Sequence, residues 1–166
     1  MSDTSLRITE IFHSLQGETS TTGLPTVFVR LTGCPLRCSY CDTAYAFEGG
    51  SKITLSDIIA TVDDYGANYV TVTGGEPLAQ PECIVLLRQL CDLGYTVSLE
   101  TSGAMPVHTV DSRVVKIVDL KTPGSGEVTR NLYENIEYLL PHDEVKFVIC
   151  NRQDYDWCCL KIDELR

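Results

Sequence analysis

Positive charge is scarce in this sequence. Its 166 residues include 13 Lys and Arg against 23 Asp and Glu, which gives a formal net charge of -10. The sequence also has no tract of clustered basic residues. Because phosphate contacts need clustered cations, this composition argues against direct binding of nucleic acid. Apolar runs long enough to span a membrane are missing, and the start, MSDTSLRITE, lacks a signal-peptide layout. We therefore expect a cytoplasmic protein with no membrane segment.

Linkers, internal repeats and low-complexity segments are missing too, so we expect one domain over residues 1–166. Cysteine, by contrast, is plentiful. In a reducing compartment the eight cysteines are expected as metal ligands or small core side chains rather than disulfides. Those without cluster spacing, which we predict to be buried, are Cys83, Cys91, Cys150, Cys158 and Cys159. The adjacent Cys158 and Cys159 cannot both face one core.

The stretch CPLRCSYCDT contains the other three cysteines. Cys34, Cys38 and Cys41 follow a Cys-x3-Cys-x2-Cys spacing in a loop with Gly33 and Pro35. A closed structural zinc site takes four protein ligands, whereas three thiolates leave one position for something other than protein. The spacing favours an iron-sulfur cluster with one open iron. Two alternatives stay open: a zinc site completed by a distant cysteine, or a chance group of buried thiols.

Hydrophobic periodicity predicts strands that alternate with helices. We expect strands at 8–13, 26–32, 68–73, 95–100, 114–120 and 144–149. We expect helices from Thr54 to Gly66, from Pro81 to Gly94, at 131–140 and at 154–165, the last carrying Trp157, Leu160 and Ile162 as its apolar residues. This alternation implies parallel strands joined by right-handed crossovers.

The predicted fold class is α/β: a partial, open β/α barrel with an N-terminal β-hairpin. The chain is too short for a closed eight-stranded barrel, which needs roughly 250 residues. In such folds the loops at the carboxyl ends of the strands share one face and bind ligands. The cysteine loop, TGGEP (73–77), ETSG (100–103) and DLK (119–121) all follow predicted strands.

Two segments, the predicted strand at 26–32 and TGGEP, raise specific questions about ligand binding. The strand at 26–32 is apolar on both faces, as if helices covered both, except for Arg30. A buried guanidinium needs an anion, either within the protein or on a ligand.

In TGGEP the two glycines let backbone approach a ligand, and the Glu76 carboxylate with nearby carbonyls can hold an ammonium group. An ordinary tight turn is the alternative there.

Taken together, the Cys-x3-Cys-x-Tyr-Cys loop and the GGEP that follows one βα unit later resemble the radical S-adenosylmethionine (SAM) superfamily. That resemblance implies a 4Fe-4S cluster on the three cysteines and SAM bound at the open iron, whose reductive cleavage gives a 5'-deoxyadenosyl radical. It also implies an electron donor of the flavodoxin type. The SAM contacts it implies are Tyr40, Gly75, Glu76, Ser102, Asp119 and Lys121.

SLQGE (14–18), Gly23-x-Pro25, Arg30, Gly33-Cys34 and CDT (41–43) resemble, within that superfamily, the 7-carboxy-7-deazaguanine synthase family. The resemblance spans nearly the whole chain. It implies a lyase that converts 6-carboxy-5,6,7,8-tetrahydropterin to a 7-deazapurine precursor of queuosine, and a possible homodimer. The substrate contacts it implies are Leu15, Gln16, Gly17, Glu18, Arg30 and Thr73, with Arg30 on the substrate carboxylate. It also implies Mg²⁺ at Thr43, with Asp42 assisting.

The sequence departs from that family in two ways. Thr19 follows SLQGE where many relatives have glycine, and family members usually continue for several dozen residues beyond this length. We therefore expect that the last C-terminal elements of the barrel are not included in 1–166. Two other functions stay open: a glycyl-radical-enzyme activase, against which SLQGE and Arg30 argue, and a non-enzymatic zinc-binding module.

Overall fold

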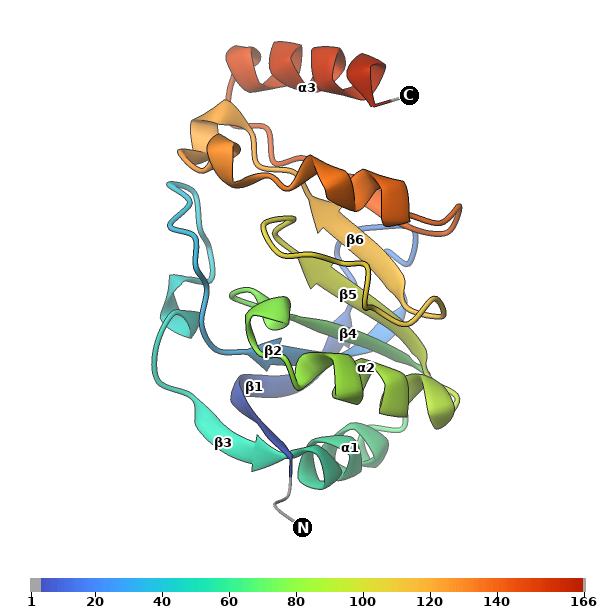
Figure 1. The fold of residues 1–166 in the computed structure, drawn as a ribbon. Helices are drawn as coiled ribbons and strands as arrows, with labels where there is room; N and C mark the ends of the chain where they lie inside the picture. The colour runs from blue at the N-terminus through green and yellow to red at the C-terminus, as the bar shows by residue number, and fades with distance from the viewer. Residues whose placement is uncertain (1–3, 166) are drawn as a thin grey trace.

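A seven-stranded sheet in the order β3-β1-β2-β4-β5-β6-β7 forms the centre of the protein (Figure 1). The computed structural model describes residues 4–165, so the ends of the predicted domain, 1–3 and 166, lie outside the described residues. The strands are β1 (Ser5–Leu15), β2 (Pro25–Leu31), β3 (Ser51–Thr54), β4 (Tyr69–Gly74), β5 (Thr96–Thr101), β6 (Val115–Asp119) and β7 (Glu144–Lys146). β1 pairs antiparallel with β2 and β3, and the later neighbours pair in parallel. The predicted open β/α barrel with its hairpin is confirmed.

Two helices, α1 (Leu55–Asp64) and α2 (Cys83–Asp92), cover one face of this sheet (Figure 1). α1 begins where predicted, because the Thr54 hydroxyl accepts a hydrogen bond of 3.1 Å from the Asp57 N–H. α2 begins two residues after Pro81 and ends before Gly94, which has a φ of 91°. Both helices therefore follow the capping signals in the sequence.

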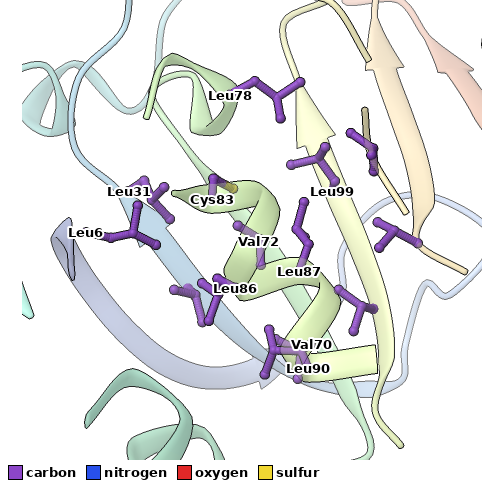
Figure 2. Packing of buried hydrophobic residues seen from close by; sticks show 14 of the residues in the cluster. Leu6, Leu31, Val70, Val72, Leu78, Cys83, Leu86, Leu87, Leu90 and Leu99 are labelled. Carbon is purple, nitrogen blue, oxygen red and sulfur yellow. The ribbon is translucent and has the colours of Figure 1, made fainter. Parts of the chain in front are cut away.

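The hydrophobic core lies between these helices and the sheet. Figure 2 shows α2 with Leu86, Leu87 and Leu90 beside Val70 and Val72 of β4, and all five side chains are buried. Burial of each such side chain contributes roughly 1.5 to 3 kcal/mol. The core thus fixes α1 and α2 on one face and leaves the other face of the central strands for different residues.

That other face is mixed, with polar and charged side chains beside a few apolar ones. Side chains alternate along a strand, so the residues between the core valines and leucines point away from α1 and α2. The ones that line a cavity there are Phe28, Arg30, Thr73, Glu100, Ile117 and Asp119. The expectation that helices cover β2 on both faces is therefore wrong, because its second face borders this cavity.

Several elements differ from the sequence-based expectation. β3 was not predicted; it pairs with residues 5–8 of β1. The segment 131–140 forms a 3-10 helix at Tyr133–Tyr138 rather than an α-helix. Its Asn135 side chain is buried and bonds to a loop, accepting from Val107 N–H (3.1 Å) and donating to the Met105 carbonyl (2.9 Å). These tertiary bonds hold a tighter turn than helix periodicity predicts. Further 3-10 turns are Ala44–Ala46, Pro77–Ala79, Pro123–Ser125 and Val128–Arg130.

The last helix, α3 (Arg152–Glu164), packs differently from its predicted apolar pattern. Leu160 is 65% exposed and Ile162 40% exposed, whereas Asp154 and Cys158 are buried. Asp154 anchors the helix by accepting hydrogen bonds from the Gly124 N–H (2.7 Å) and the Cys150 N–H (3.0 Å). A polar anchor therefore replaces the expected hydrophobic stripe.

Of the five cysteines predicted to be buried, Cys83 and Cys158 are buried, Cys91 is half-buried, and Cys150 and Cys159 are exposed. The prediction is wrong for the last two. Cys158 and Cys159 do face different environments, as adjacent helical residues must. Within residues 4–165, none of the helices combines the length and apolarity needed to cross a bilayer.

Candidate active site

A cavity of about 470 Å³ lies where the strands β2, β4, β5 and β6 end. The loops after these strands supply much of its wall, as the parallel arrangement requires. Of the residues predicted for a site, those lining it are Leu15, Gln16, Gly17, Glu18, Arg30, Cys34, Cys38, Tyr40, Cys41, Asp42, Thr43, Thr73, Gly75, Ser102, Asp119 and Lys121. Glu76 is the predicted residue that the structure leaves out of this wall.

The cysteine loop is packed directly on the GGEP turn. Glu76 N–H donates to the Gly33 carbonyl at 2.8 Å, and Gly75 N–H donates to the Leu31 carbonyl at 3.1 Å. A Cβ on Gly75 would lie only 2.1 Å from the Gly33 oxygen, and one on Gly74 would lie 2.2 Å from the Leu31 oxygen. Only glycine fits at either position. The glycine pair therefore holds the two motifs together, a role beyond the ligand approach that the sequence suggested.

The three thiols of this loop stand around the cavity as half-buried groups. Burial raises the pKa of Cys34 and of Cys38, and the positive charge of Lys121 offsets only part of that effect. Loading with iron or zinc must therefore displace protons from these sulfurs.

In the part of the chain that the structure describes, no three Cys, His, Asp or Glu side chains converge as the ligands of one metal ion. Among the described residues, the cavity wall includes these three cysteines and no fourth cysteine or histidine. A structural zinc ion takes four protein ligands, whereas a 4Fe-4S cluster held by three thiolates keeps one iron open. The three-thiol donor set therefore fits a 4Fe-4S cluster.

Glu76 forms hydrogen bonds within the GGEP turn and to the end of β5, and it does not line the cavity. Its carboxylate is fully buried and accepts hydrogen bonds from Leu78 N–H (2.9 Å), Ser102 N–H (2.7 Å), Ser102 Oγ (2.5 Å) and Thr101 Oγ1 (2.9 Å). These bonds tie the GGEP turn to the end of β5. The structure thus gives Glu76 internal hydrogen-bond partners, and its contact with an ammonium group stays a prediction.

Arg30 has a partner within the protein and also borders the cavity. Its Nε donates to Glu10 Oε1 at 2.8 Å, and its side chain remains 16% exposed. The Tyr45 hydroxyl donates to the same carboxylate oxygen at 2.7 Å. The Tyr45 hydrogen bond, followed by the Arg30 interaction, lowers the pKa of Glu10 despite partial burial. Of the two alternatives that the sequence left open, the internal ion pair is therefore present, and a contact with an anionic ligand stays a prediction for a side chain that borders the cavity.

Glu100 is a cavity residue that sequence analysis did not single out. Its carboxylate accepts from Thr73 Oγ1 at 2.8 Å and from Gln16 Nε2 at 3.3 Å. Gln16 is 4% exposed, and its Oε1 accepts from the Glu18 N–H at 3.2 Å, so it is not a solvated loop residue. The period-two pattern of β4 and β5, which places Thr73 and Glu100 on one face, was the signal available in the sequence.

Lys146 of β7 is a second residue that sequence analysis missed. It lines the cavity and forms an ion pair with Glu18 of the SLQGE segment. Burial alone would lower the pKa of Lys146, but the Glu18 hydrogen bond and nearby carboxylates outweigh it and raise that pKa. Ser20 Oγ also donates to Glu144 Oε1 at 2.6 Å. The β1–β2 loop is therefore bonded to β7 across the cavity side of the sheet.

Asp119, a residue of the cavity wall, has an unused acceptor. Its Oδ2 pairs with Lys121 Nζ at 2.9 Å, while Oδ1 is buried and has no hydrogen-bond partner among residues 4–165. A buried acceptor of this kind suits a donor on a bound ligand. Elsewhere in the wall, Thr43 Oγ1 donates to Asp42 Oδ1 at 2.7 Å, which places two oxygen ligands together.

The fold and this site define an open β/α protein built around a three-cysteine cluster loop, and comparisons agree. Residues 28–122 match the family described as the radical SAM superfamily. The 7-carboxy-7-deazaguanine synthase of Koribacter versatilis is 49% identical, over 92% of this chain and 68% of that protein. The Chlorobaculum tepidum enzyme of the same name is 46% identical, over 92% and 70%.

A solved structure gives the same result. The crystal structure of QueE from Escherichia coli superposes with a TM-score of 0.79 and 26% identity, covering 96% of this chain and 78% of that one. The chain belongs to the radical SAM superfamily and, within it, to the 7-carboxy-7-deazaguanine synthase family.

Proposed function

We propose that this protein is a radical SAM lyase that converts 6-carboxy-5,6,7,8-tetrahydropterin to 7-carboxy-7-deazaguanine in 7-deazapurine biosynthesis. The reaction releases ammonia and needs no net oxidant, because substrate and products differ only by that loss. One observation carries the proposal beyond the names of the relatives. The three-thiol loop and Arg30, a cation suited to a carboxylate, border the same cavity.

Cys34, Cys38 and Cys41 would hold the 4Fe-4S cluster in this proposal. When bound, the reduced cluster and SAM supply the organic radical that starts the reaction. The chain's own contribution is to place these groups and exclude water. Glu76 does so indirectly by fixing the GGEP turn, and the free Asp119 Oδ1 offers an acceptor to a SAM hydroxyl.

The other SAM contacts in this proposal lie along the same wall. They are Tyr40, Gly75, Ser102 and Lys121. The Tyr40 ring lies 5.9 Å from Lys121 Nζ, so its aromatic face and that cation belong to one side of the cavity. This arrangement leaves the opposite side, formed by β1, β2 and their loop, to the substrate.

The pterin would bind on the polar face of the sheet. Arg30 takes the substrate carboxylate, and Thr73 and Glu100 offer acceptor oxygens to the N–H groups of the ring edge. Leu15, Gly17 and Glu18 line the loop side, while Gln16 supports that side through its bonds to Glu100 and Thr71. Thr43 and Asp42 supply oxygen ligands for Mg²⁺, which also takes substrate oxygens and water.

The proposal includes partners and a compartment. A flavodoxin-type protein would deliver the electron, and the family resemblance implies a homodimer. The eight free thiols support a reducing cytoplasm. We treat residues 1–166 as one radical SAM core domain.

The two other functions considered from the sequence are less well supported. A zinc-binding module does not account for the cavity lined by polar and charged side chains beside the three thiols. A glycyl-radical-enzyme activase acts on a protein partner, whereas this cavity is lined by charged groups such as Arg30, Glu100 and Lys146, which suit a small polar substrate.

An anaerobic assay tests the proposal. The reconstituted protein, mixed with 6-carboxytetrahydropterin, SAM and dithionite, should release 7-carboxy-7-deazaguanine and ammonia, identified by mass spectrometry. SAM cleavage without any deazapurine would contradict the substrate, and a protein that binds zinc but no sulfide would contradict the whole proposal.

A further inference from the structure

We infer that Glu10 and Tyr45 are positioning residues that hold the Arg30 guanidinium in the orientation that recognises the substrate carboxylate. This inference rests on the proposed function, in which Arg30 takes that carboxylate. It adds two residues that act through Arg30: Glu10 of β1 and Tyr45 of the 3-10 turn Ala44–Ala46. Neither belongs to the SLQGE, CDT or GGEP motifs.

The sheet itself places Glu10 beside Arg30. The two residues are directly opposite each other in the antiparallel β1·β2 pair, next to a register shift between Ile8 and Glu10. Side chains opposite one another in a strand pair stand on the same face. The Glu10 carboxylate therefore reaches the nearest guanidinium nitrogen, Nε, at 2.8 Å from within the sheet.

Tyr45 reaches the same carboxylate from the cysteine loop. It lies in the 3-10 turn Ala44–Ala46, two residues after Thr43, and its hydroxyl donates to Glu10 Oε1 at 2.7 Å. The Arg30 Cζ atom lies 5.9 Å from the Tyr45 ring centre and 5.7 Å from the Phe12 ring centre. Two rings and one carboxylate thus surround the guanidinium.

This arrangement leaves one edge of the guanidinium unused. Within residues 4–165, Arg30 donates a hydrogen bond to another side chain only through Nε. Its two terminal nitrogens are not among the buried atoms that lack a hydrogen-bond partner. A carboxylate binds best to a pair of parallel N–H groups. With Nε held by Glu10, the two terminal nitrogens form such a pair on a side chain that borders the cavity.

Fixing Arg30 in advance should strengthen recognition of the carboxylate. A free arginine loses much rotamer entropy when it binds, and a side chain already held in place loses less. The negative charge of Glu10 acts in the opposite direction, because it partly offsets the cation that attracts the substrate. Position and charge can be separated, since Gln at position 10 keeps an acceptor oxygen and removes the charge.

Equilibrium binding to the anaerobically reconstituted protein tests the inference with two probes, 6-carboxypterin and pterin without the carboxyl group. Glu10→Ala should weaken 6-carboxypterin binding by about tenfold and leave pterin binding within about twofold. Tyr45→Phe, which keeps the ring, should weaken 6-carboxypterin binding by about threefold. Glu10→Gln should stay within about threefold of the unchanged protein. In turnover, Glu10→Ala should raise KM far more than it lowers kcat.

Two further variants make the result decisive. Tyr95→Phe removes a similar tyrosine–carboxylate bond, to Asp63 at 3.1 Å on the helix side, and should not change the ratio of the two affinities. Arg30→Ala should abolish the preference for 6-carboxypterin. If it does not, the role of Arg30 in the proposed function is wrong.

If Arg30→Ala abolishes the preference but Glu10→Ala preserves it, the positioning inference alone is overturned. Iron content and a thermal melt of every variant identify any that misfolds. Should Glu10→Ala misfold, Tyr45→Phe decides, and an unchanged affinity ratio in that variant overturns the inference.

Discussion

The two faces of the central sheet are built from alternate residues of the same strands, yet one is an apolar core and the other carries charged and polar side chains. Toward α1 and α2, Val29 and Val72 are fully buried in an apolar core. One residue further along each strand, Arg30 and Thr73 face the cavity and are paired with each other in the β2·β4 register. A shift of a single position therefore separates residues that stabilise the fold from residues that line the candidate site.

The difference shows how a polar face can persist in a folded strand. The Glu100 carboxylate accepts hydrogen bonds from both Thr73 and Gln16, so these polar side chains have partners within the protein before any ligand binds. The apolar face needs no such pairing, because its stability comes from removal of surface from water. Substitutions of neighbouring residues on one strand can therefore test the contributions of the two faces to stability and to ligand binding separately.

The largest contrast should come from cysteines on the two sides. Cys34→Ala should abolish the 4Fe-4S cluster and SAM cleavage with little loss of folding stability, since Cys34 is half-buried in the cavity wall. Cys83→Ala should keep the cluster but lower the free energy of unfolding by about 1 kcal/mol, because that thiol is fully buried under the helices. Iron and sulfide analysis together with a thermal melt measures both.

The opposite pattern would contradict the division between the faces. A cluster retained in Cys34→Ala would mean that the loop does not hold it. Cys38→Ala and Cys41→Ala provide matched tests of the same loop, and all three variants should behave alike.

A reciprocal swap of neighbouring residues on β4 should give smaller effects. Val72→Thr places a hydroxyl in the core and should cost about 1 to 3 kcal/mol of stability without changing ligand affinity at the same temperature. Thr73→Val removes the 2.8 Å bond to Glu100 and should instead weaken 6-carboxypterin binding by about 1 kcal/mol. Urea unfolding and equilibrium binding of both variants are the measurements. If both variants lose stability equally and bind equally well, the polar face is structural.

The sequence predicted the parts of this arrangement that depend on local signals. As expected, α1 begins at the Thr54 cap and α2 ends before Gly94, and the open parallel sheet follows from the alternation of strands and helices. The cavity could also be anticipated, because the carboxyl ends of parallel strands share one edge. Cys34, Arg30 and Ser102 do lie around one cavity there.

What the sequence could not supply depends on register and tertiary contacts. Glu10 is an ordinary polar strand residue until the β1·β2 pairing places it opposite Arg30. Lys146 acquires its position from the pairing of β7, far along the chain from its partner Glu18. Asn135 likewise bonds to a loop about thirty residues away, which favours a 3-10 turn over the predicted α-helix. Sequence patterns report on residues that are close in the chain, whereas these contacts join residues that are far apart in it.

The smallest predicted effect concerns backbone strain on the cavity side. Among residues 4–165, Thr19 is the one non-glycine residue with positive φ, at 69°, and it lies in the β1–β2 loop that bonds to β7. A β-branched residue pays about 1 to 2 kcal/mol for this left-handed conformation, which asparagine adopts more readily. Thr19→Asn should therefore raise the free energy of unfolding by about 0.5 kcal/mol and the Tm by about 1 to 2 °C. Thr21→Asn, in the same loop but without positive φ, should give no gain. A Tm for Thr19→Asn that equals or falls below that of Thr21→Asn would show that the loop carries no relievable strain at Thr19.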